Sequence, residues 1–221
     1  PSFTLLRMAK RKKKQDGGAF GGARKAGPSA ASPSPDFLMS PRESERMMKT
    51  IQKIMASRDF ESEEEMQRFF QQNLIGKLPE ELEAMLPDDE PQTDLERAES
   101  LIEGIPEGTR PREIARIAKQ ALAISEDCMG AWLELGVSAE NPDTALEHYE
   151  KGIERGRACF KHLIEEAGGE RGLWGHIEAR DFMRLLEEKA RILVGMTKLE
   201  QAAEVYQEML ALNPNDNQGI R

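Results

Sequence analysis

The sequence predicts an all-α protein in which antiparallel helix pairs stack side by side as a right-handed superhelix. Three observations predict it. A spacing of large and small apolar residues occurs twice, helix-start signals recur along the chain, and the composition suits solvated helices. Of the 221 residues, 32% are charged and only 5% are aromatic, which disfavours a β-sandwich or a β-barrel.

The repeated spacing is W-x-x-L-G followed by A-x-x-x-Y, and a partial second copy comes near the end of the chain. Eight residues carry it: Trp132, Leu135, Gly136, Ala145, Tyr149, Ala202, Tyr206 and Pro214. The large residues of the first helix face the second helix, and the small residues let the two backbones approach. This spacing is typical of the 34-residue tetratricopeptide repeat, a helix–turn–helix unit.

Helix-start signals mark the other elements. Ser40, Ser62 and Thr93 are each followed three residues later by Glu, which is a capping box. Prolines at positions 79, 111 and 142 suit the first turn of a helix. In the last part of the chain we expect one helix from about 179 to 194 and another from 199 to 212. No Pro or Gly pair follows position 142 until Gly168-Gly169, so we expect that helix to run some 25 residues.

These signals divide the chain into three parts. Residues 1–39 form a basic, low-complexity tail that we expect to be disordered. Residues 40–91 form a small helical segment, which could be a subdomain, a cap on the repeats or a dimer surface. Residues 92–221 hold about three repeats. The chain ends one turn into what should be another helix, without a capping helix. Truncation is one hypothesis, and a partner chain that covers the last apolar face is the other.

Charge is unevenly distributed. The first 25 residues contain eight Lys or Arg and one acid, Asp16, whereas the whole chain has a formal charge of −9. An acidic body disfavours broad nucleic-acid binding, except through residues 8–25. Two cysteines do not make a disulfide framework, and the sequence lacks an apolar run of about 18 residues that could span a membrane. We therefore expect a cytoplasmic protein.

Residues 94–221 also resemble a particular family. Three stretches carry the resemblance: residues 121–128 (ALAISEDC), residues 174–184 (WGHIEARDFMR) and residues 212–221 (LNPNDNQGIR). They are similar to the tetratricopeptide-like region of the suppressor-of-tumorigenicity-seven type and its bacterial relatives. The resemblance implies a helical-repeat fold and a scaffold role, and it implies no reaction.

In tetratricopeptide arrays, the first helix of each pair lines a groove that binds a partner. By this resemblance the groove positions are Leu133, Val137, Arg184, Glu187, Arg191, Glu96, Glu99 and Glu103. The predicted groove is acidic at one end and partly basic at the other, and it lacks the Lys and Asn set that holds a peptide's terminal carboxylate. The alternative is that these charges are solvated helix faces. We expect the same of most of the fourteen acids between residues 61 and 103, for which an acidic partner-binding surface is the alternative.

The segment between the second and third repeats contains a second candidate, formed by Trp174, Glu178 and Arg180. Arg180 and Arg184 are spaced i and i+4 and can share a helix face. The simpler interpretation is that Trp174 fills a packing gap and Glu178 pairs with an arginine. The functional interpretation is an anchor for a partner segment.

The sequence predicts no catalytic, cofactor or metal site. Its three histidines, at 148, 162 and 176, would place the first two about 21 Å apart on a straight helix, beyond reach of one metal ion. The predicted function is a non-catalytic adaptor or scaffold that binds another protein or peptide. The alternatives are an accessory protein that contacts nucleic acid through its basic tail, or a non-catalytic subunit of an enzyme complex. The oligomeric state is left open.

Overall fold

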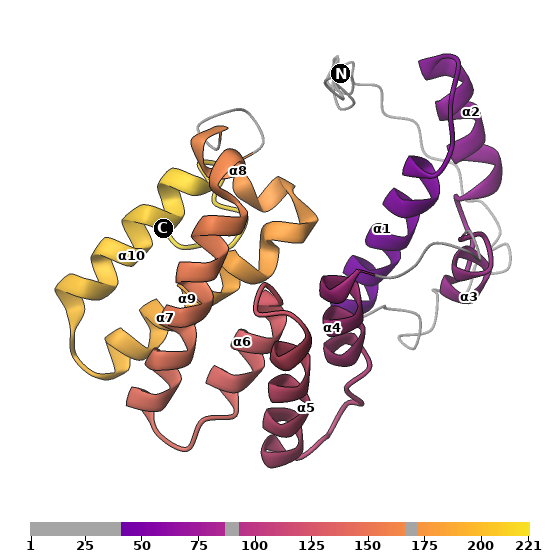
Figure 1. The fold of residues 1–221 in the computed structure, drawn as a ribbon. Coiled ribbons are helices and arrows are strands. Elements are labelled where there is room, and N and C mark those ends of the chain that lie inside the picture. Colours follow the sequence, from indigo (N-terminus) through magenta and orange to yellow (C-terminus); the bar gives the residue numbers. More distant parts are fainter. Residues whose placement is uncertain (1–40, 87–92, 167–171) are drawn as a thin grey trace, which may run out of the picture. The chain divides into compact units, whose positions relative to one another are not determined.

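The computed structural model describes residues 41–86, 93–166 and 172–221 (Figure 1). These residues contain ten α-helices, two short 3-10 helices and no β-strand. The all-α prediction is therefore confirmed. The predictions for the basic tail, including nucleic-acid contact through residues 8–25, lie outside the described residues.

The first three helices surround a small apolar core of their own. They are α1 (Pro41–Ala56), α2 (Glu63–Asn73) and α3 (Pro79–Glu83). Ile54, Leu74 and Leu82 are almost inaccessible to solvent at its centre. The predicted start of α2 is confirmed, because the Ser62 hydroxyl accepts a hydrogen bond from the Glu65 backbone N–H.

Three helix pairs follow along the chain. They are α4 (Asp94–Glu103) with α5 (Pro111–Ile124), α6 (Met129–Val137) with α7 (Pro142–Cys159), and α9 (Arg180–Gly195) with α10 (Leu199–Leu212). Within each pair the helices pack closely, and the second helix of one pair also contacts the first helix of the next. The first helices, α4, α6 and α9, contact one another in turn (Figure 1).

Glycine allows the closest approach between α6 and α7. A Cβ atom built on Gly136 would lie 1.9 Å from Cε1 of Tyr149, so no larger residue fits there. The Tyr149 ring is 2% exposed, and burial raises the pKa of its hydroxyl to about 12. Trp132 borders the same contact, and its indole N–H donates to the backbone oxygen of Glu126.

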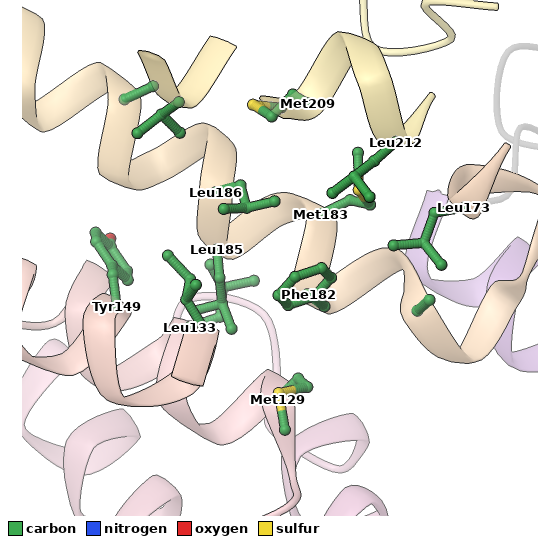
Figure 2. Packing of buried hydrophobic residues seen from close by; sticks show 14 of the residues in the cluster. Met129, Leu133, Tyr149, Leu173, Phe182, Met183, Leu185, Leu186, Met209 and Leu212 are labelled. Atoms are coloured by element: carbon green, nitrogen blue, oxygen red, sulfur yellow. The ribbon is translucent and has the colours of Figure 1, made fainter. Parts of the chain in front are cut away.

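Helix α9 is the centre of the main core. Figure 2 shows it between the α6–α7 pair, which carries Leu133 and Tyr149, and α10, which carries Met209 and Leu212. Its own buried residues point to both sides: Phe182, Met183, Leu185, Leu186, Ala190 and Leu193. This two-sided burial fixes the direction in which the polar side chains of α9 project.

The expected 25-residue helix after Pro142 is wrong. Helix α7 ends at Cys159, and a separate short helix, α8 (Lys161–Glu166), follows. Phe160 leaves the helical conformation, with φ −99° and ψ 17°, and its ring lies 6.0 Å from that of Phe182. Packing of an aromatic ring on the core thus ends the helix without Gly or Pro.

The chain does not begin another helix after Leu212. The predicted bounds of the two preceding helices are confirmed within one residue, but residues 213–221 form turns. Asp216 has φ 51° and its carboxylate accepts hydrogen bonds from the backbone N–H groups of Ile220 and Arg221. Gln218 donates to Glu187 at 2.8 Å, which ties this segment to α9.

Candidate functional site: a polar face that carries the first helix

The face formed by the first helices of the three pairs, called here the α4–α6–α9 face, carries the predicted groove residues. Helix α1 lies on it and reaches it with charged side chains. Three residues of α1 make these contacts: Glu45, Lys49 and Lys53, at i, i+4 and i+8. This spacing places them on one side of the helix.

Helix α4 provides the acidic part of the face. Lys53 Nζ is 2.6 Å from Glu96 Oε1. One turn further along α4, Lys49 Nζ lies between two carboxylates, 3.5 Å from Glu99 and 3.1 Å from Glu103. All three predicted α4 groove residues therefore contact α1.

Helix α9 provides the basic part. Arg184 Nη2 and Arg180 Nη1 both donate to Glu45 Oε1, at 2.6 Å and 3.0 Å. Arg184 also donates to Asp181 at 2.8 Å, and Arg180 donates to the backbone oxygen of Trp174 at 3.2 Å. Both guanidinium groups lie over the Trp174 ring, 5.3 and 5.7 Å from its centre. We call these two arginines with Trp174 the arginine cradle.

The cradle holds Glu45 in its ionised form. Burial alone would raise the pKa of Glu45, but hydrogen bonds from Arg184 and Arg180, together with their positive charges, lower it below its ordinary value. The Glu45 side chain is only 15% exposed, the least of the charged groups in this contact. Arg184 is also partly buried. Burial alone would lower its pKa, but the carboxylates of Glu45 and Asp181 raise it.

Lys49 and its two acids form a cluster with one positive and two negative charges. Burial would lower the pKa of Lys49, but Glu99 and Glu103 raise it. Burial raises the pKa of Glu99, and the neighbouring Glu103 and Asp181 raise it further, against the attraction of Lys49. The raised pKa of Lys49 and the raised pKa of Glu99 are consistent with each other, because a single lysine cannot neutralise both carboxylates. The α4 end of the face therefore keeps an excess of negative charge.

Glu96 has two roles. Its carboxylate accepts from Lys53 on α1 and from the backbone N–H of Thr93, whose hydroxyl accepts from the Glu96 backbone N–H. The predicted capping box at Thr93 is therefore confirmed. The hydrogen bond from Lys53, then that from the Thr93 backbone, lowers the pKa of Glu96 to about 2.

Apolar packing of α1 is directed elsewhere. Met47, Ile51, Ile54 and Met55 belong to the core shared with α2 and α3, and Arg46 pairs with Glu83 of α3 at 2.7 Å. A cavity of about 140 Å³ lies between α1 and the α4–α6–α9 face, lined among others by Lys49, Glu103, Leu133 and Arg184. A second hollow of about 560 Å³ lies between α1 and α4. The contact is thus held by charge pairs around incompletely filled space.

The remaining predicted groove residues do not all meet α1. Leu133 is 8% exposed and belongs to the main core, and Val137 is 61% exposed. Arg191 pairs with Glu187 and Glu188 on its own helix. Of the predicted groove residues, Glu96, Glu99, Glu103 and Arg184 therefore form ion pairs with α1. Val137 and Arg191 lie outside this contact.

The interpretation that Glu178 pairs with an arginine differs from the arrangement found. The Glu178 carboxylate is 3.8 Å from His176, and the arginines instead bind Glu45. Trp174 is half-buried against the main core, and it also supports both guanidinium groups.

Sequence reasoning missed the three α1 residues. Their i, i+4, i+8 spacing of acid, base and base was visible in the sequence, opposite the apolar stripe of the same helix. No sequence signal indicated which surface they would meet. Among the described residues, no three His, Cys, Asp or Glu side chains are placed to share a metal ion.

No helix in the described part of the chain combines the length and the apolar character needed to cross a membrane. No protein-family model matches the sequence, and neither a curated protein nor a solved structure is significantly similar to it.

Proposed function

We propose that the protein is a non-catalytic adaptor that binds a helical segment of another protein on its α4–α6–α9 face, in the manner of a tetratricopeptide-like groove. The observation that supports the proposal is the contact with α1. A face that accommodates one helix through three charged side chains of α4 and two of α9 has the shape and the charges to accommodate another.

The energetics favour an exchangeable contact. The Lys53–Glu96 pair is partly exposed, and ion pairs at exposed sites contribute at most about 1 kcal/mol each and are weakened by salt. The apolar residues of α1 pack with α2 and α3 and not on the face. Exchange of α1 for a partner helix therefore exposes little apolar surface.

The experiment is affinity capture from native lysate with matched full-length variants. A face variant, Glu99→Lys with Glu103→Lys, reverses the acidic end but keeps Glu96 and so the α4 capping box. A control variant, Glu147→Lys with Glu154→Lys, makes the same change in charge at exposed positions of α7. Circular dichroism checks that both retain the helicity of the wild type.

The proposal predicts a discrete protein that is captured by the wild type and the control variant and lost with the face variant. Equal capture by all three proteins would contradict the proposal, because the captured protein would then bind to another surface. A release variant with Glu45→Ala, Lys49→Ala and Lys53→Ala should capture more of the same protein, because α1 then no longer competes.

A further inference from the structure

We infer that α1 is an internal occupant of the α4–α6–α9 face, and that the face selects partner helices carrying an acidic residue followed by basic residues one and two helical turns later. This inference rests on the proposed function and specifies the partner and the regulation of the same face. The three contacts of α1 define the pattern.

The order of the charges gives the face a direction. Residues spaced by four positions advance about 6 Å along a helix, so the acid and the last base of the pattern are about 12 Å apart. At one end two guanidinium groups meet the acid, and at the other end three carboxylates meet the two bases. A helix of the same composition in the opposite order would place like charges together, which weakens binding.

The arginine cradle is prepared for a carboxylate. Arg184 is held by Asp181, Arg180 is held by the backbone oxygen of Trp174, and the indole ring lies behind both. Both arginines donate to the same oxygen of Glu45, Oε1. Groups fixed by other contacts lose little freedom when a ligand binds, which favours affinity and specificity.

The same contacts make α1 a competitor. A segment of the same chain competes at an effective concentration that can reach the millimolar range. A partner helix must displace α1. The apparent affinity for the partner is therefore the intrinsic affinity multiplied by the fraction of molecules in which the face is open. The cavity and the hollow beneath α1 show that α1 does not fill the space above the face, which favours this displacement.

The experiment uses a fluorescein-labelled peptide of residues 41–56 in which Met47, Ile51, Ile54 and Met55 are replaced by alanine. These replacements leave the three charges and remove the side that packs on α2 and α3. The control peptide has the same composition with its charge order reversed, through Glu45→Lys and Lys53→Glu. Fluorescence anisotropy at low salt measures binding of each peptide to the full-length wild type and to the release variant.

We expect the release variant to bind the first peptide at least about tenfold more tightly than the wild type does, and more tightly than it binds the control peptide. Binding should fall at 0.5 M salt, where screening is strong. Equal affinity of wild type and release variant would overturn the role of α1 as occupant. Equal affinity for the two peptides, or no binding of either, would overturn the charge pattern.

These failures remain distinct from failure of the proposed function. A release variant that ignores both peptides but still captures a lysate protein through Glu99 and Glu103 would retain the face as a docking site with a different partner chemistry. If the wild type is a dimer that the peptide converts to a monomer, the helix that occupies the face is α1 of a second copy and not α1 of the same chain. Size-exclusion chromatography with light scattering distinguishes that outcome.

Discussion

Arg184 Nη2 donates a 2.6 Å hydrogen bond to Glu45 Oε1 across 139 positions of sequence. The bond joins the last helix pair to the first helix of the described chain. It belongs to a line of charges in which Lys49 and Lys53 meet the acids of α4. The contact places the chain's own helix over the surface that the sequence had indicated for a partner.

The Glu45–Arg184 pair should show measurable energetic coupling. In a double-mutant cycle with Glu45→Gln and Arg184→Gln, we expect a coupling free energy of about 1–2 kcal/mol, because a hydrogen bond between partly buried charges is stronger than a neutral one. Urea unfolding of the four proteins measures it. The pair Glu188–Arg191 on the exposed side of α9 is the control and should couple by less than about 0.5 kcal/mol. Equal coupling in the two cycles would argue against a structured contact.

Gly136 should tolerate no side chain. In Gly136→Ala the new methyl group would fall within 1.9 Å of the Tyr149 ring, and we expect a loss of about 2–3 kcal/mol in the free energy of unfolding. Gly195→Ala is the matched control, because a Cβ atom at that position meets nothing within 4 Å. That control should be neutral or stabilising by up to about 1 kcal/mol. If the two variants have the same stability, the α6–α7 packing described above is incorrect.

The Lys53–Glu96 pair predicts a dependence on pH. The pKa of Glu96 is about 2 in the folded chain, below its ordinary value of 4.5, so its contribution to stability is complete above about pH 5 and is lost as the pH falls from 4.5 toward 2. Glu96→Gln retains a capping side chain but removes the charge. We expect the wild type to exceed this variant in stability by about 1 kcal/mol at pH 7, since the pair is partly exposed.

Unfolding titrations at pH 7, 5, 4 and 3 test this dependence. The difference between wild type and Glu96→Gln should be constant down to pH 5 and shrink below it. A difference that does not change with pH would show that the charge of Glu96 is not what stabilises the contact.

The two cysteines should differ in reactivity. Cys128 is 0% exposed, and burial raises the pKa of its thiol to about 12. Cys159 is half-buried, and burial raises the pKa of its thiol as well. Thiolate is the reactive species, so at pH 8 we expect Cys128 to react about a thousandfold more slowly than a free thiol. Labelling of Cys159→Ser should therefore become fast only in denaturant, and rapid labelling in buffer would contradict the burial of Cys128.

The last two helices show how much of the fold the sequence predicts. Gly195 and the residues after it mark the turn, and apolar residues at helical spacing mark the buried faces of α9 and α10. The N-cap at Ser62 and the capping box at Thr93 located two further helix starts, although at Ser62 the Glu65 carboxylate accepts from the Glu61 backbone N–H and does not close the predicted capping box. These signals are local, so they can be read without knowing the packing.

The errors concern long-range packing. Helix α7 ends where Phe160 turns onto Phe182, 22 positions later, and no breaker residue indicates that end. The acids of α4 and Arg184 were identified as a face, but their partners on α1 were not. A charged stripe on a helix looks the same in the sequence whether it meets water or another helix.

Zero-length carbodiimide crosslinking of the wild type, followed by peptide mass spectrometry, tests the placement of α1 most directly. The reagent joins an amine to a carboxylate only in direct contact. We predict Lys53–Glu96 and Lys49–Glu103 crosslinks within a monomer, with contact distances of 2.6 and 3.1 Å, weakened by 0.5 M salt. The pair Lys77–Glu81, one helical turn apart in sequence, is the internal control at 2.8 Å. Recovery of the control crosslink without either of the α1–α4 crosslinks would contradict the placement of α1 against α4.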